Sequence, residues 1–465
     1  TCLEADAALV DEAIARAVAA QPAWDLRQAR ERADILRKAA ELFEEHAPEL
    51  LALCIREAGK TLPDALSEVR EAVDFIRYYA SEAERHFGDP QVLPGPTGER
   101  NTLGLRGRGV FVCISPWNFP LAIFSGQVAA ALAAGNAVLA KPAEQTPLIA
   151  CRAVQLMQKA GVPGDVLAFL PGDGPLVGGR AVSDPRIAGV AFTGSTETAR
   201  LINRKLAGKD GPIATLIAET GGQNAMFVDS SALPEQVVLD AVTSAFNSAG
   251  QRCSALRLLC VQEHIAPRVI ELLKGYMREL VIGDPADLAT DVGPVIDSDA
   301  REMLRAHVAD FTSHSQIIHQ CELPASTAAG TFVAPVAIEI DDIARLTREV
   351  FGPVLHVYRY RAKRLQETVA SVNATGYGLT MGLHSRINRR ASALTSYSAA
   401  GNIYINRNMI GAVVGVQPFG GRGLSGTGPK AGGPHYLPRF GSEYTVSHNL
   451  SAVGGNASLL SLNEN

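Results

Sequence analysis

The sequence of 465 residues lacks most of the short motifs that identify a catalytic or metal site by themselves. It has no H-E-x-x-H pair for a catalytic zinc, no G-x-S-x-G nucleophile turn and no G-x-x-x-x-G-K-S/T phosphate loop. Its ten histidines show no spacing typical of metal ligands, so we expect no metal site. Seven widely spaced cysteines include no C-x-x-C pair, which indicates free thiols in a reducing compartment.

An excess of charge of one sign is also lacking, because 43 Lys and Arg residues face 48 Asp and Glu residues. The net charge of −5 argues against a broad nucleic-acid surface. No charged segment precedes an apolar run at the start, so we see no signal peptide and expect a cytoplasmic protein. Residues 110–140 carry no charge, but Pro116, Pro120, Gly126 and Gly135 interrupt them, and we expect no membrane span.

The sequence does contain alternating short apolar runs and helix-length segments, after about 80 residues of amphipathic helical pattern. In a first series, strands are predicted at 110–114, 137–140, 166–170, 187–192 and 213–218, with helices near 122–134, 146–160, 174–182 and 196–208. In a second series, strands are predicted near 225–228, 257–263, 354–360, 381–384 and 401–405, with helices between them. This alternation predicts the α/β class, with two domains built on largely parallel sheets.

Three side chains are candidates for reactive groups, and two of them, Glu219 and Asn118, lie at strand ends, where parallel-sheet enzymes place such groups. Cys253 follows Gly250 and small neighbours, so its thiol is a candidate nucleophile, with an inert buried thiol as the alternative. Glu219 ends an apolar strand; it is a candidate general base, or else a carboxylate in solvent. Asn118 is held between bulky residues and prolines, and its amide could stabilise an oxyanion or cap the next helix.

Two further polar loops are candidates for nucleotide binding. Residues 141–146 follow one predicted strand, and residues 193–196 follow another and enter a helix. Amides and hydroxyls at such a helix start can bind a pyrophosphate. The run from Gly172 to Gly178 is one residue longer than the G-x-G-x-x-G fingerprint, so the generic motif gives only weak support for nucleotide binding.

Taken in order, seven segments resemble motifs of the NAD(P)-dependent aldehyde dehydrogenase superfamily. They are PWNFP at 116–120, KPAEQT at 141–146, FTGST at 192–196, ETGG at 219–222, GQRC at 250–253, EVFGP at 349–353 and PFGG at 418–421. The resemblance implies the aldehyde dehydrogenase fold, with a Rossmann-like NAD-binding domain, an α/β catalytic domain and a small β oligomerisation flap. The implied bounds are 1–219 for the first domain, interrupted by an oligomerisation hairpin near 89–107, then 220–429, and a C-terminal oligomerisation segment and tail at 430–465.

A narrower resemblance lies in residues 411–421, 432–436 and 452–457, which are similar to the L-glutamate-γ-semialdehyde (1-pyrroline-5-carboxylate) dehydrogenase group. The tail in particular resembles the dehydrogenase half of bacterial bifunctional proline utilisation proteins. This implies NAD-dependent oxidation of the semialdehyde to L-glutamate, the second step of proline catabolism. The implied partners are a second copy of the chain, through residues 436–450 and 89–107, and a fused or associated proline dehydrogenase half. The alternatives are another small semialdehyde, a CoA-acylating enzyme, a cofactor-free thiol esterase and a non-catalytic scaffold.

The resemblance also implies roles for individual residues. Cys253 would attack the aldehyde carbon to give a thiohemiacetal, whose oxyanion the Asn118 side chain and the Cys253 N–H would hold. Loss of hydride to NAD would leave a thioester, and Glu219 would activate the water that hydrolyses it.

The cofactor and substrate contacts are implied in the same way. Glu144 would bond the ribose 2′-hydroxyl and repel a 2′-phosphate, so NAD is expected rather than NADP. The substrate would be held by Ser254, Gly411 and Ala412 and packed by Phe419, although residues 411–412 could also be a plain turn. The expected cofactor-binding residues are Ile114, Ser115, Pro116, Trp117, Lys141, Glu144, Gly174, Thr193, Gly194, Ser195, Glu349 and Phe351.

Overall fold

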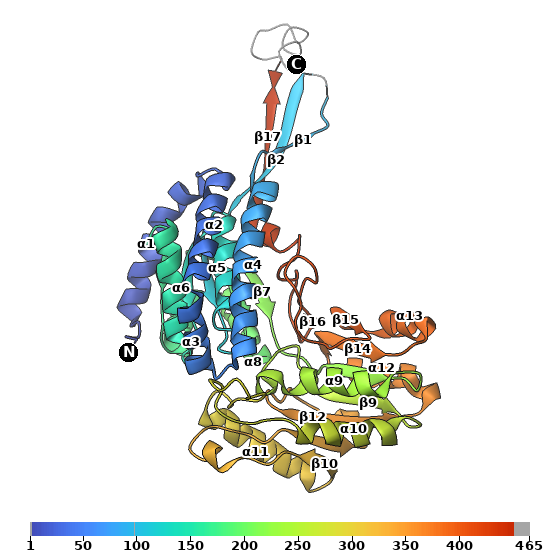
Figure 1. Cartoon of the computed structure of the whole chain (residues 1–465). Helices are drawn as coiled ribbons and strands as arrows, with labels where there is room; N and C mark the ends of the chain where they lie inside the picture. Colours follow the sequence, from blue (N-terminus) through green and yellow to red (C-terminus); the bar gives the residue numbers. More distant parts are fainter. Residues whose placement is uncertain (1, 97, 451–465) are drawn as a thin grey trace.

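The computed structural model describes residues 2–96 and 98–450, which form a helical layer, two large sheets and a projecting arm (Figure 1). The resembling segment at 452–457 lies outside the described residues. In the described part of the chain, no helix is long and apolar enough to cross a membrane.

The N-terminal layer consists of four helices, two of which carry a pronounced apolar stripe. In α2, Leu36, Ala39 and Phe43 are fully buried, because residues at this spacing lie on one face of a helix. That face packs against α4, the longest helix. The helices are α1 (Ala7–Asp25), α2 (Ala29–Glu45), α3 (Ala47–Ala58) and α4 (Leu62–Phe87).

The first sheet is parallel and has five strands in the order β5-β4-β3-β6-β7. Its central strands are almost wholly apolar because helices cover both faces, as is typical of parallel sheets. The strands are β3 (Val110–Ile114), β4 (Ala137–Lys141), β5 (Leu167–Phe169), β6 (Ile187–Thr193) and β7 (Thr215–Glu219). The helices among them are α5 (Ala122–Ala133), α6 (Pro147–Ala160), α7 (Gly179–Ser183) and α8 (Thr196–Ala207).

Two details of the first series differ from the sequence prediction. The helix predicted at 174–182 is a π-helical turn, Gly174–Gly178, followed by the short α7. Asp173 caps this turn by accepting a hydrogen bond from the Leu176 N–H, 2.8 Å away. The strand predicted from residue 213 begins at Thr215, because Gly211, with φ +138°, and Pro212 turn the chain and leave Ile213 exposed.

The second sheet has seven strands in the order β10-β11-β12-β9-β8-β14-β15. The strands are β8 (Ala225–Val228), β9 (Leu258–Gln262), β10 (Gln316–Gln320), β11 (Val336–Ile340), β12 (Val354–Tyr360), β14 (Thr380–His384) and β15 (Asn402–Ile405). The sequence prediction lacked β10 and β11. β10 lies at the sheet edge and is mostly polar, so it lacks the apolar run that marks the other strands of this sheet. It also pairs antiparallel with β11, whereas the other strands pair with one another in parallel. The helices around this sheet are α9 (Pro234–Phe246), α10 (Ala266–Arg278), α11 (Ser298–Thr312), α12 (Leu365–Asn373) and α13 (Asn388–Tyr397).

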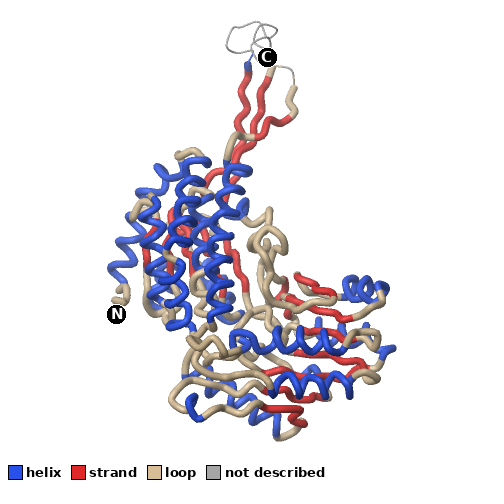
Figure 2. Tube along the Cα trace, viewed as in Figure 1, coloured by secondary structure: helices blue, strands red, loops and turns tan. Residues whose placement is uncertain are grey.

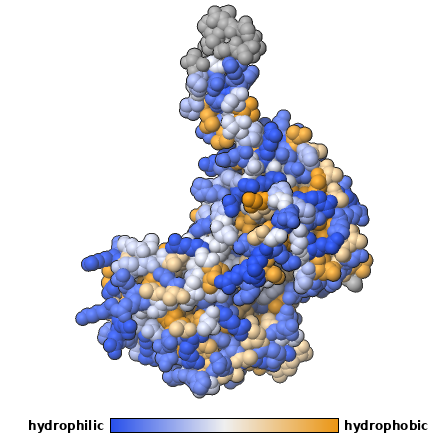
Figure 3. All heavy atoms as spheres, turned by 180° about the vertical axis from the view of Figure 1, so that it is seen from behind, coloured by the Kyte–Doolittle hydropathy of each residue, from blue (hydrophilic) through white to orange (hydrophobic). Residues whose placement is uncertain are grey.

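The arm is an antiparallel sheet of β1 (Gln91–Leu93), β2 (Glu99–Gly107) and β17 (Gly441–Asn449), which projects from the body (Figure 2). β17 pairs with β2 along its whole length, so the two segments expected to mediate oligomerisation lie side by side although they are far apart in the sequence. Val92 and Val446 are exposed on it, and Figure 3 shows apolar residues on the arm beside hydrophilic ones.

Candidate active site

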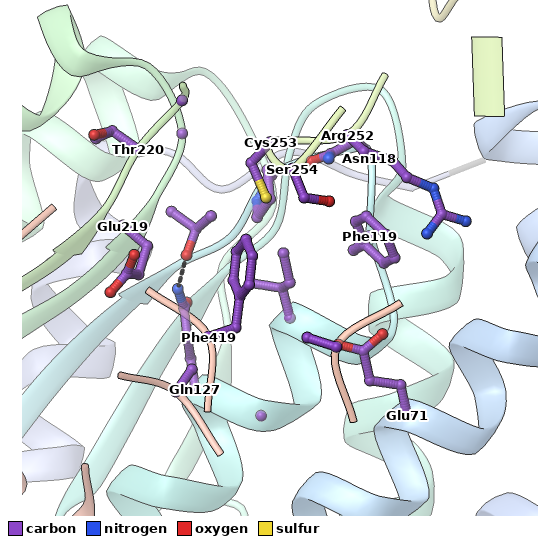
Figure 4. Close-up of a pocket in the computed structure, with 18 of the residues that line it drawn as sticks. Glu71, Asn118, Phe119, Gln127, Glu219, Thr220, Arg252, Cys253, Ser254 and Phe419 are labelled. Carbon is purple, nitrogen blue, oxygen red and sulfur yellow. Dashed lines mark hydrogen bonds between the residues drawn. The ribbon is translucent and has the colours of Figure 1, made fainter. Parts of the chain in front are cut away.

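A cavity of about 790 Å³ lies where the two large sheets meet. Its walls include the carboxyl ends of β6 and β7 from the first sheet and the loops before β9 and β12 from the second. Fourteen of the site residues predicted from the sequence line it: Pro116, Trp117, Asn118, Thr193, Gly194, Ser195, Glu219, Cys253, Ser254, Glu349, Phe351, Gly411, Ala412 and Phe419. Figure 4 shows the Cys253 thiol directed into the space that Glu219, Phe419 and Phe119 surround.

The loop that carries Cys253 is tightly constrained. Three successive residues, Ser248 to Gly250, have φ between +53° and +66°, the left-handed region. A Cβ on Gly250 would lie 2.2 Å from the Gly352 carbonyl oxygen, so a side chain does not fit there. The Asn224 amide donates to the carbonyl oxygen of Cys253 at 2.6 Å. The backbone of the thiol-bearing residue is therefore held in one position.

The environment of the thiol favours its neutral form. Burial and the neighbouring carboxylates of Glu349, Glu219 and Glu71 raise the pKa of Cys253 to about 12. A cysteine surrounded by acids at a cavity wall differs from Cys260, which is fully buried in a strand. In this site the thiol needs a base or an attacked carbonyl to lose its proton at neutral pH.

Glu219 lies at the end of β7 with its carboxylate shielded from solvent. Gly421 donates its N–H to Oε2 at 3.2 Å, while Oε1 is buried and has no hydrogen-bond partner in the described part of the chain. Burial raises the pKa of Glu219 well above its ordinary value, although the Gly421 N–H and Lys430 lower it. The alternative of a carboxylate in solvent is therefore wrong, and the group has the pKa direction that a general base requires.

The Asn118 side chain does not cap the helix that follows it. Its Nδ2 donates to the carbonyl oxygen of Gln251 at 3.1 Å, which ties it to the Cys253 loop. The start of α5 is instead capped by Glu68 of α4, which accepts the N–H of Leu121 at 2.8 Å. The capping alternative is wrong, and the amide lies at the cavity wall near the thiol loop.

Three wall residues were missed by sequence reasoning: Glu71, Phe119 and Gln127. Glu71 of α4 is one of the residues that line the cavity (Figure 4). It is partly buried, and burial and Glu68 raise its pKa to about 7. In the sequence it is one of many acids on an amphipathic helix, so no local signal distinguishes it. Phe119 has Lys60 above its ring, with Nζ 4.0 Å from the centroid, and Arg252 at 5.3 Å. Gln127 also lines the cavity and donates to the Thr193 hydroxyl at 2.9 Å.

The other five predicted residues lie beside this cavity rather than on its wall. They are at the carboxyl edge of the first sheet: Ile114, Ser115, Lys141, Glu144 and Gly174. The Lys141 ammonium lies 3.5 Å from Glu144 Oε1, which also accepts the Gly174 N–H at 2.7 Å. Ser115 donates its N–H to the Lys141 carbonyl oxygen, so these five positions form one connected group.

At the start of α8, Ser195 is the N-cap, and its hydroxyl accepts the Thr198 N–H at 3.1 Å. This confirms the prediction that the Gly-Ser-Thr segment enters a helix. No group of three or more His, Cys, Asp or Glu side chains within residues 2–96 and 98–450 is arranged to hold a metal.

Comparison with known proteins identifies the family of the chain. Residues 1–446 match the family described as "Aldehyde dehydrogenase family". The chain is 52% identical over 445 residues to the bifunctional protein PutA of Klebsiella aerogenes. This match covers 94% of this chain but only 33% of the relative. The chain therefore spans about a third of that relative's length.

Two further relatives match along most of their own length. A 1-pyrroline-5-carboxylate dehydrogenase of Geobacillus is 37% identical over 429 residues, covering 91% of this chain and 82% of the relative. The crystal structure of a 1-pyrroline-5-carboxylate dehydrogenase from Thermus with bound NAD has a TM-score of 0.92 and 34% identity, covering 96% of this chain and 86% of that one. The fold is thus the aldehyde dehydrogenase fold, and the chain belongs to the aldehyde dehydrogenase family.

Proposed function

We propose that this chain oxidises L-glutamate-γ-semialdehyde to L-glutamate with NAD. The observation that carries the proposal is that Cys253, Glu219 and Asn118, from three separate segments of the chain, line one cavity. The relatives support the substrate, because those matched along most of their length are named 1-pyrroline-5-carboxylate dehydrogenases. The CoA-acylating and esterase alternatives leave Glu219 or the Lys141–Glu144 group without a role.

The chemistry divides between three side chains. Cys253 attacks the aldehyde carbon, and its proton passes to a water molecule in the cavity as the carbon–sulfur bond forms, because a pKa of about 12 keeps the thiol neutral beforehand. The Asn118 amide and the Cys253 N–H hold the oxyanion. NAD supplies the acceptor for the hydride that leaves this carbon. Glu219 takes a proton from the water that hydrolyses the resulting thioester, which releases the acid and frees the thiol.

A second group of residues that line the cavity suits an amino-acid aldehyde as the substrate. Ser254 and the backbone amides of residues 411–412 would hold the substrate α-carboxylate, since amides bind an anion without a competing charge. The Gly411 backbone has φ +70°, and a Cβ there would meet nothing within 4 Å, so this loop presents open backbone to the cavity. Glu71 would pair with the α-ammonium, and Phe119 and Phe419 would pack on the aliphatic chain.

The group around Lys141 fits a dinucleotide ribose. A half-exposed Glu144 carboxylate beside a buried ammonium offers an acceptor and a donor for two hydroxyls, and its charge disfavours a 2′-phosphate. Ser195 at the start of α8 would lie near the pyrophosphate, and Glu349 and Phe351 near the nicotinamide ribose. Ile114, Ser115, Pro116, Trp117, Gly174, Thr193 and Gly194 complete this proposed contact set.

The same proposal includes the domains and partners. The NAD-binding domain would comprise residues 1–219, the catalytic domain 220–429, and the oligomerisation segment and tail 430–465. The arm of β1, β2 and β17 would pair two copies into a dimer, and a proline dehydrogenase half would be fused to or associated with the chain. We also propose a cytoplasmic location.

The test is product formation by this chain with the semialdehyde and NAD in the absence of CoA. We expect NADH and L-glutamate in equal amounts. Strict dependence on CoA would contradict hydrolysis by Glu219. No NADH from the semialdehyde, together with hydrolysis of a simple ester in the absence of NAD, would indicate an esterase instead.

A further inference from the structure

A lysine, Lys430, packs against the loop that contacts the Glu219 carboxylate. Phe419 and Ala431 pair as a two-residue antiparallel bridge, with N–H to carbonyl distances of 3.0 and 2.8 Å. This pairing places Gly420 between Glu219 and Lys430. A Cβ on Gly420 would lie 2.6 Å from Glu219 Oε1 and 3.2 Å from Lys430 Cα, so the three residues are stacked in close contact.

Lys430 is fixed in this place by polar contacts. Its Nζ donates to the carbonyl oxygen of Gly401 and to Asn402 Oδ1, the latter at 3.2 Å. Asn402 Oδ1 also accepts the Gly420 N–H at 3.2 Å, and its Nδ2 donates to the Pro418 carbonyl oxygen at 2.9 Å. The lysine and the asparagine therefore anchor the loop whose next residue, Gly421, donates to Glu219.

We propose that Lys430 is a positioning residue that keeps Glu219 ionised and in place for thioester hydrolysis. The inference rests on the proposed role of Glu219. Glu219 is shielded from solvent, so its charged form is costly unless a cation lies nearby. Lys430 does not line the cavity wall, so it can supply this charge without contacting the substrate.

The other titratable groups that face Glu219 do not compete for this role. Tyr79 and Tyr436 are buried, and burial raises the pKa of each phenol well above its ordinary value, so both stay neutral. The Cys253 thiol is neutral and becomes an uncharged thioester. Burial lowers the pKa of the Lys430 ammonium, Glu219 raises that pKa, and the nearby positive charge of Arg422 lowers it. The carboxylate and the ammonium therefore stabilise each other's charged forms.

The test compares three variants, Lys430→Met, Lys430→Gln and Lys430→Arg, in a single turnover of the full chain. NADH formation reports the thioester-forming stage, and release of L-glutamate reports its hydrolysis. Loss of the lysine charge should raise the pKa of Glu219, and the ionised base is the active form. The rising limb of hydrolysis against pH should thus move up by about one unit in the Met and Gln variants. NADH formation should persist in all three variants. In Lys430→Arg, which keeps the positive charge, the rising limb of hydrolysis against pH should lie where it does in the wild type.

Lys430→Gln removes the positive charge but keeps a side-chain amide that can donate to the Gly401 carbonyl oxygen, so it distinguishes the effect of the charge from the effect of the hydrogen bond. If hydrolysis falls equally at every pH in all three variants, or if Lys430→Met has the wild-type profile, the inference is wrong. These outcomes differ from failure of the proposed function, in which the wild-type chain forms no NADH or in which Glu219→Gln hydrolyses the thioester at the normal rate.

Discussion

Helix α4 carries two kinds of carboxylate within three turns, and their surroundings are opposite. Asp64 and Glu68 are buried and paired: Asp64 accepts from Arg252 Nη2 at 2.8 Å, and Lys60 Nζ lies 2.8 Å from Glu68. Glu71, one turn beyond Glu68, points instead to the cavity, and no ion pair to it occurs in the described part of the chain. One helix thus supplies both the supports of the site and part of its wall.

The presence or absence of an ion pair distinguishes the acids that stabilise the loops of the site from the acid that is available to bind a ligand. Burial raises the pKa of Asp64, but Arg252, Lys60 and the Ser248 hydroxyl outweigh it and hold that pKa below its ordinary value. Burial and like charge raise the pKa of Glu71 to about 7. A paired acid keeps its charge and stabilises the loops, whereas an unpaired acid in a cavity is available for a ligand or a proton.

The largest expected effect comes from removing the group that the unpaired acids surround. Cys253→Ala should reduce NADH formation to background, because no other thiol lines the cavity within the described residues. NAD should still raise the melting temperature of the variant, which serves as the folding control. Substantial dehydrogenase activity in this variant would contradict the nucleophile assignment.

Breaking the ion pair between Asp64 and Arg252 should lower the stability of the fold. Arg252→Met leaves the Asp64 carboxylate buried without its partner, and we expect the free energy of unfolding to fall by about 3–5 kcal/mol. The lowered pKa of Asp64 means that the pair stabilises the fold above about pH 4 and that this contribution is lost as the pH falls further. Acid unfolding should therefore be steeper in the wild type than in the variant. Denaturant titrations at several pH values measure both quantities, with Glu71→Gln as a matched control on the same helix.

The smallest effect should appear at Glu71. Its ionised form would bind the substrate ammonium, so KM for the semialdehyde should fall as the pH rises through about 7. In Glu71→Gln, KM should be about tenfold higher above that pH and lack this step. The ratio of the two KM values at each pH cancels any titration of the substrate itself. A ratio that does not change with pH would place the ammonium elsewhere.

Sequence reasoning located the reactive residues because each follows a strand or a glycine-rich turn with its own local pattern. Cys253, Glu219 and Asn118 all line the cavity, although only the structure decides that Asn118 contacts Gln251 rather than capping α5. That cap comes from Glu68, 53 residues earlier in the chain, which no local pattern could indicate.

The same limit explains the other differences. β10 was not predicted because an edge strand needs no apolar run, and Glu71 was not predicted because its neighbours in the sequence are also charged. Lys430 acquires its position from the bridge between Phe419 and Ala431, which exists only in the folded chain.

We propose that the cavity selects an amino-acid aldehyde through Glu71, an acid on its wall that has no ion pair in the described part of the chain. The most direct measurement is kcat/KM with NAD for L-glutamate-γ-semialdehyde relative to an unsubstituted aldehyde of the same chain length, in the wild type and in Glu71→Gln. We predict a strong preference for the semialdehyde that falls about tenfold in the variant, with the plain aldehyde unaffected. Equal use of the two aldehydes by the wild-type chain would contradict the account.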